Sequence, residues 1–110
     1  MMRILPIALT VALLVGAAPA AAKTRNVKVG DDYYVRKGSP PTVKVSKGTT
    51  VKWNFRGNDQ HNVVVTSGPV SFQSALKKSG SFKRKMKRKG TYKIVCSIHA
   101  PDMRMTLKVK

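Results

Sequence analysis

The sequence predicts an all-β fold, a β-sandwich of about seven to eight short strands. Three observations lead to this prediction. Apolar and polar residues alternate with a period of two in nearly every segment after residue 22, turn residues separate these segments at regular intervals, and no long segment has the apolar stripe of a helix. Short strands at this spacing are typical of sandwiches and barrels, in which we expect antiparallel pairing.

Residues 1–22 have the organisation of a signal peptide that is cleaved near Ala22. Arg3 supplies a positive start, an apolar run follows, and small residues precede the expected cleavage site. The apolar run is shorter than the roughly 20 residues that span a bilayer, and no cysteine lies nearby to carry a lipid anchor. We therefore expect a periplasmic or extracellular protein whose single domain occupies residues 23–110 and has no membrane span.

The strands are predicted from alternating apolar residues and from the turns between them. Strands are expected over residues 27–29, 42–46, 49–56, 62–66, 91–96 and 103–109, with one helical turn near 72–76. Trp53 lies between Val51 and Phe55 on one face of its strand, so we expect its side chain in the core.

The chain is strongly basic. It has 22 lysines and arginines but four acidic residues, all aspartates, and a formal net charge of +18. Removal of Arg3 with the signal peptide lowers this charge to +17. The chain offers few candidate residues for a hydrolase that uses paired carboxylates, because Asp31 and Asp32 are the only adjacent acidic pair. We do not expect an enzyme.

Eight of the basic residues lie between Lys77 and Lys89, a segment called the basic run below. Such runs are usually solvated faces, yet the net charge exceeds what solubility requires. We therefore expect attraction to an acidic redox partner or to an anionic cell-envelope surface. Nucleic acid is not an expected partner, because Phe82 is the only aromatic residue within the run and the chain has an export signal.

The residues with the best metal-binding side chains fall at the ends of predicted strands. The chain has two histidines, His61 and His99, and one cysteine, Cys96, and Met103 follows closely. A lone cysteine in an exported domain is an oxidation hazard, an intermolecular bridge or a metal ligand. Two imidazoles, a thiolate and a weak thioether describe a blue-copper centre, whereas structural zinc prefers four strong ligands.

The sequence around these positions resembles the cupredoxins, and in particular their plastocyanin-, amicyanin- and pseudoazurin-like members. The resemblance runs from about residue 27 to residue 109. It rests on GTYKIVCSIHAPDM at 90–103, VKWNF at 51–55 and HNV at 61–63. It implies a Greek-key β-sandwich that binds one type 1 copper ion and carries single electrons by Cu(II)/Cu(I) cycling. We expect a monomer.

Residue by residue, the resemblance makes His61, Cys96 and His99 copper ligands. It assigns to Asn62 the hydrogen bond that ties the two ligand loops together near the thiolate. We assign the weak axial bond to Met103, which begins the final strand beside the ligand loop. Met105 shares its face but lies about 7 Å further along, at roughly 3.3 Å per residue, and is expected in the core.

Two alternatives to an electron carrier remain open. The same ligands could bind copper for storage, delivery or resistance. A metal-free basic sandwich with an incidental cysteine could instead bind anionic cell-surface polymers. For an electron carrier, we expect electrons to leave through His99, surrounded by a small apolar patch of Ile98, Ala100 and Pro101.

Overall fold

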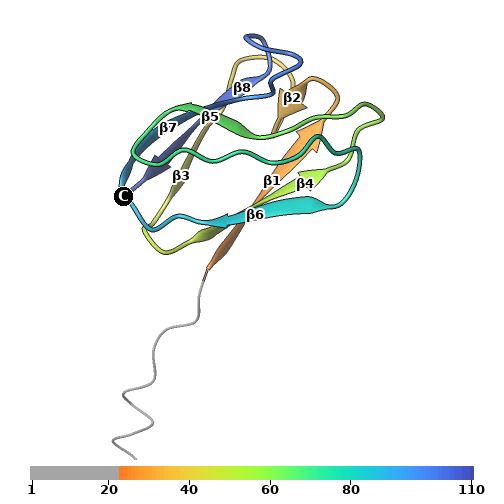
Figure 1. Cartoon of the computed structure of the whole chain (residues 1–110). Helices are drawn as coiled ribbons and strands as arrows, with labels where there is room; N and C mark the ends of the chain where they lie inside the picture. The colour runs from red at the N-terminus through yellow and green to blue at the C-terminus, as the bar shows by residue number, and fades with distance from the viewer. Residues whose placement is uncertain (1–22) are drawn as a thin grey trace, which may run out of the picture.

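The computed structural model describes residues 23–110, so the predicted signal peptide lies outside the described residues. Within this part of the chain, eight strands form two four-stranded sheets that pack face to face (Figure 1). The strands are β1 (Thr24–Gly30), β2 (Tyr33–Tyr34), β3 (Thr42–Val45), β4 (Thr50–Phe55), β5 (Val64–Ser67), β6 (Ser81–Lys85), β7 (Gly90–Val95) and β8 (Arg104–Val109). The predicted all-β sandwich is confirmed.

Both sheets are mixed, whereas the sequence led us to expect antiparallel pairing throughout. The strand orders are β2-β1-β4-β6 and β3-β8-β7-β5, and the pairs β1–β4 and β3–β8 are parallel. Parallel strands cannot be joined by a hairpin, so the chain passes to the other sheet between them. Because β1 and β4 run in the same direction, the segments that follow them emerge at the same end of the sandwich. This end carries the candidate site.

The alternating pattern located most strands within a residue or two, but it missed two strands, β2 and β6, and wrongly suggested one helical turn. β2 has only two residues, too few to show a period. Around Phe72 the chain is extended instead of helical. Val65 N–H donates to the Phe72 carbonyl at 3.1 Å, and Ser74 N–H donates to the Val63 carbonyl at 2.8 Å. This segment therefore lies along β5, which satisfies backbone groups that a helical turn would leave open.

The core lies between the two sheets and is formed by the inward-facing residue of each alternating pair. Trp53 is fully buried, as predicted, and its ring centroid lies 6.1 Å from that of Phe72 and 5.8 Å from that of Phe82. Aromatic pairs at such distances add to the stabilisation from apolar burial. Residues 23–110 contain no helix that is long and apolar enough to cross a membrane.

Candidate metal centre

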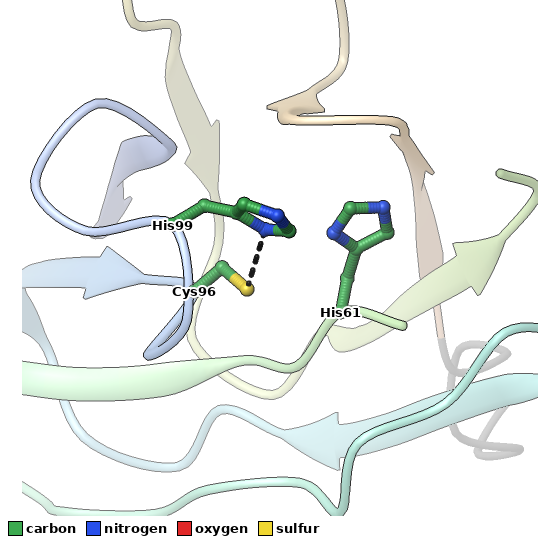
Figure 2. Close-up of side chains that lie close together, drawn as sticks. All are labelled: His61, Cys96 and His99. Carbon is green, nitrogen blue, oxygen red and sulfur yellow. Dashed lines mark hydrogen bonds between the residues drawn. The ribbon is translucent and has the colours of Figure 1, made fainter. Parts of the chain in front are cut away.

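Three candidate ligands converge at the end of the sandwich where β1 and β4 finish. His61 precedes β5, whereas Cys96 and His99 lie in the loop between β7 and β8 (Figure 2). One ligand atom from each of the three residues lies within 4.8 Å of the other two. The Cys96 Sγ is 3.5 Å from His99 Nδ1, and the two imidazole centroids are 5.0 Å apart. The donors are close enough to bind a single ion.

Backbone hydrogen bonds fix the two segments that carry these ligands. His61 forms a two-way bridge with Lys77: each backbone N–H donates to the other residue's carbonyl, at 3.0 and 2.9 Å. In the second loop, His99 N–H donates to the Cys96 carbonyl at 3.2 Å, and Met103 N–H donates to the His99 carbonyl at 3.1 Å. The loop is thus a turn that backbone hydrogen bonds close, and they fix the backbone of the residues that carry the candidate ligands.

Asn62 joins the two ligand segments directly. Its side-chain Oδ1 accepts from the Ser97 N–H at 2.8 Å, and its Nδ2 donates to the Ser97 Oγ at 2.9 Å. The Tyr34 hydroxyl donates to the Asn62 carbonyl at 2.6 Å from β2, a contact that the sequence did not predict. Burial raises the pKa of Tyr34 above its ordinary value, and the neighbouring Cys96 adds to this shift. Tyr34 therefore remains a neutral donor.

The backbone register places Met103 beside Cys96 and Met105 one step further into the sheet. In the β7–β8 ladder Ile94 lies opposite Met105, so continuation by two residues places Cys96 opposite Met103. The Cys96 N–H donates to the Met103 carbonyl at 3.1 Å, which shows that the pairing extends this far. Both methionines are buried, but Met105 lies within β8 among core residues. The position of Met103 fits an axial ligand.

Met103→Leu is expected to raise the reduction potential of the copper-loaded protein and to preserve its blue colour, because the axial bond is weak and long. Met105→Leu, the matched control, is expected to leave the potential unchanged. As a volume-conserving core exchange, it should lower the free energy of unfolding by less than about 1.5 kcal/mol. Voltammetry and chemical unfolding of both variants test the assignment. A potential that changes with Met105 and not with Met103 contradicts it.

The candidate centre is buried except at one residue. His61, Cys96 and Met103 have no exposed surface, whereas the His99 side chain is 28% exposed. The residues around His99 are exposed and apolar: Ile98, at 52%, Ala100 and Pro101. His99 is thus the only one of the four predicted ligands that reaches solvent.

Sequence reasoning missed the contribution of two aspartates. Asp31 Oδ1 lies 3.0 Å from His61 Nε2, and Asp32 Oδ1 lies 3.1 Å from His99 Nε2. In the sequence, Asp31 and Asp32 stand out only as the one adjacent acidic pair, too few carboxylates to indicate a hydrolase. The only indication in the sequence was that acidic residues are rare in this basic chain, yet two of them are adjacent. Their position beside His61 follows only from the parallel pairing of β1 with β4.

Hydrogen bonds hold the carboxyl group of Asp31 in its ionised form. The backbone N–H groups of Asp59 and Asn58, followed by the His61 side chain, lower its pKa from 3.8 to about 2. Gly57 allows this close approach, because a Cβ atom at residue 57 would collide with Asp31 Oδ1. The segment that leads to His61 is therefore wrapped around the Asp31 carboxylate.

The unsatisfied atom at this site fits a metal ligand. His61 Nδ1 is buried and has no hydrogen-bond partner among the described residues, although its Nε2 contacts Asp31. Figure 2 shows one ring nitrogen of His61 directed toward Cys96 and His99. A buried polar atom without a partner costs free energy, and a bound ion removes that cost. Two imidazoles, a thiolate and a thioether match type 1 copper better than other common ions.

Comparisons with known proteins agree with this fold. The family model described as a cupredoxin-like domain matches residues 3–109. The plastocyanin of Prochlorothrix hollandica is 28% identical over 95 residues, which cover 79% of this chain and 72% of that protein.

Two solved structures extend the comparison. A variant of amicyanin in its Cu(I) form has a TM-score of 0.68 and 26% identity, over 83% of this chain and 86% of its own. A copper-containing nitrite reductase from Thermus scotoductus has a TM-score of 0.66 and 22% identity, over 86% of this chain but 24% of its own. At that identity the reductase shows a shared fold alone. Because the family model spans almost the whole sequence, this chain belongs to the cupredoxin-like family.

Proposed function

We propose that this cupredoxin is an exported carrier of single electrons that binds one copper ion through His61, Cys96, His99 and Met103. The observation that carries the proposal is the buried His61 Nδ1, which has no hydrogen-bond partner within residues 23–110 and is directed toward Cys96 and His99. Copper in such a site supplies a one-electron couple. Export is supported by the signal-like composition of residues 1–22.

The protein residues contribute a fixed geometry. Electron transfer is fast when the ligands move little between oxidation states, so a rigid site favours it. Here Asn62 ties the His61 segment to the cysteine loop, and the bridge to Lys77 fixes the His61 backbone. Hydrogen bonds within the chain thus position the segments that carry the imidazoles and the thiolate. This arrangement suits a carrier, since neither oxidation state requires the loops to rebuild.

The pattern of exposure favours an electron carrier over a protein that delivers copper. Delivery requires an incoming ligand to reach the ion, but His61, Cys96 and Met103 are fully buried. Only His99 reaches the surface, amid exposed apolar residues. An electron can pass through an exposed imidazole edge without displacing a ligand. A small apolar surface also suits the brief encounters of redox proteins, whose interfaces are small.

The electron self-exchange rate of the copper-loaded protein tests this function. We expect rapid exchange between the Cu(II) and Cu(I) forms, measured by NMR line broadening in mixtures of the two. Stoichiometric copper binding with slow exchange at every salt concentration, and transfer of the ion to a chelator within seconds, would support storage or delivery instead. Absence of copper binding after reconstitution would support a metal-free protein that binds anionic polymers.

The charges suggest an acidic partner, attracted from a distance. All four aspartates lie at the copper end: Asp31 and Asp32 contact the histidines, Asp59 lines a surface hollow with His99, and Asp102 lies in the β7–β8 loop. The rest of the described chain carries only basic ionised side chains. The molecule therefore attracts anions by its overall charge, and its copper end is the least positive region.

The basic run does not form one face, as a solvated sheet face would. Lys78 lines the hollow beside His99, close to the candidate exit. Lys83, on the edge strand β6, pairs with Lys52 of β4. Residues 87–89 lie in the connection between β6 and β7, at the end opposite to the candidate metal centre. Of these residues, Lys78 is best placed to contact a partner docked over His99.

Ionic strength should change the electron-transfer rates with opposite signs for oppositely charged reactants. We expect the rate of reaction with an anionic oxidant, hexacyanoferrate, to fall as salt is added, because attraction to the positive protein is screened. The Debye length decreases from about 30 Å at 0.01 M to about 8 Å at 0.15 M. The rate with a cationic cobalt complex, and the self-exchange rate, should rise. Rates insensitive to salt, measured by stopped flow, would mean that the charge has no role in association.

A further inference from the structure

A single turn supplies a carboxylate to each of the two candidate imidazole ligands. Asp31 and Asp32 form the two-residue connection between β1 and β2, and each contacts the Nε2 atom of a different histidine. For His99 the other nitrogen, Nδ1, is the one that faces the Cys96 sulfur. The carboxylates therefore lie on the outer side of the imidazoles, away from the thiolate.

The Asp31 carboxylate is held more firmly than that of Asp32. Both of its oxygens accept from the Asn58 N–H, at 2.9 and 3.0 Å, and Oδ1 also accepts from the Asp59 N–H at 3.0 Å. The Asp31 side chain is 36% exposed, compared with 62% for Asp32. A contact between a mostly exposed carboxylate and a partly exposed histidine contributes little. The strong effect is therefore expected from Asp31.

The contact selects one tautomer of His61. An ionised carboxylate has no proton to donate, so His61 Nε2 must carry the hydrogen in the bond to Asp31. The Nδ1 of a neutral imidazole then has a free lone pair, and this is the buried atom for which the described part of the chain offers no partner. A carboxylate that accepts from the outer nitrogen of a ligating histidine fixes the ring and makes it a stronger donor to the metal.

We propose that Asp31 is a positioning residue that holds His61 with Nδ1 ready to bind copper and stabilises Cu(II) relative to Cu(I). This inference rests on the proposed copper function and adds a control of the reduction potential. A negative charge hydrogen-bonded to a ligand strengthens binding of the more highly charged ion most. The two carboxylates of this turn lie beside the histidines, so they offset the positive charge of the remaining chain close to the ion.

The test compares Asp31→Asn with Asp59→Asn, a matched control that removes an equal charge in the neighbouring segment without removing a contact to a histidine. For Asp31→Asn we expect Cu(II) affinity, measured by chelator competition, to fall about 10- to 100-fold. Cu(I) affinity should fall less. Each tenfold difference between the two losses raises the one-electron potential by about 59 mV. Asp59→Asn should change both affinities much less.

A second measurement needs no variant and no copper. In the metal-free wild-type protein, nitrogen-15 NMR should show His61 as the tautomer with hydrogen on Nε2. The opposite tautomer would overturn the inference, as would an unchanged potential in a folded Asp31→Asn protein or an equal shift in Asp59→Asn. These outcomes differ from failure of the copper function itself, in which the wild-type protein would not form a blue complex.

Discussion

Cys96→Ser is expected to abolish the intense visible absorption of the Cu(II)-loaded protein and most of its affinity for copper. The colour arises from charge transfer between thiolate sulfur and copper, and a serine hydroxyl does not ionise at neutral pH to replace it. Cys96 is the chain's only cysteine and has no exposed surface, so no other thiol can substitute. Absorption spectra and copper content of the dialysed protein measure the two effects.

The matched control for this substitution is Ser97→Ala, the next residue in the same loop, which removes a hydroxyl that is not a candidate ligand. It is expected to keep the blue colour. Because a buried hydroxyl costs roughly 1–3 kcal/mol when it lacks a partner, the folding of Cys96→Ser must be measured separately by chemical unfolding. A folded Cys96→Ser protein that still forms an intensely blue copper complex would rule out Cys96 as the source of the colour.

Asn62→Ala is expected to lower the free energy of unfolding of the metal-free protein by about 1–3 kcal/mol. The substitution removes both hydrogen bonds to Ser97 and leaves the Ser97 N–H without its partner. These bonds connect segments 35 residues apart in the sequence, so their loss also frees the two ligand segments from each other. In the copper-loaded protein we expect a broader visible band, because the site then samples more geometries.

Asn54→Ala provides the comparison for Asn62→Ala. Asn54 donates to Asn26 Oδ1 at 3.1 Å in an exposed contact and to the Lys52 carbonyl at 3.3 Å. Surface substitutions of this kind usually change stability by less than about 0.5 kcal/mol. Equal losses in urea unfolding of the two variants would show that the Asn62 contacts contribute nothing beyond an ordinary surface hydrogen bond.

The parts of the structure that depend on local sequence were predictable. Alternation located the long strands and the buried position of Trp53, because a half-buried strand must present every second side chain to the core. The short spacing from Cys96 to His99 and Met103 predicted that these three would lie in or beside one loop, and the structure closes that loop with its own backbone hydrogen bonds. His61 was included because it is one of only two histidines and lies at the end of a predicted strand, and the family resemblance then assigned it as a ligand.

Features set by pairing between distant segments were not predictable. The parallel contact of β1 with β4 brings the Asp31 turn beside residues 57–61, and nothing in either segment alone indicates this direction. For the same reason, the expectation of purely antiparallel sheets was wrong. The predicted helical turn failed because Phe72 and its neighbours gain more by lying along β5, where tertiary contacts override local preference. The sequence did not show that Asp31 and Asp32 would each lie beside a histidine.

The visible spectrum of the purified wild-type protein after addition of one equivalent of Cu(II) tests the central claim most directly. The buried cluster of His61, Cys96 and His99, with Met103 beside it, predicts an intense blue absorption that saturates at one copper per chain and disappears on reduction. A colourless one-to-one copper complex in which the Cys96 thiol still reacts with a thiol reagent under denaturing conditions would contradict the assignment of a type 1 copper centre.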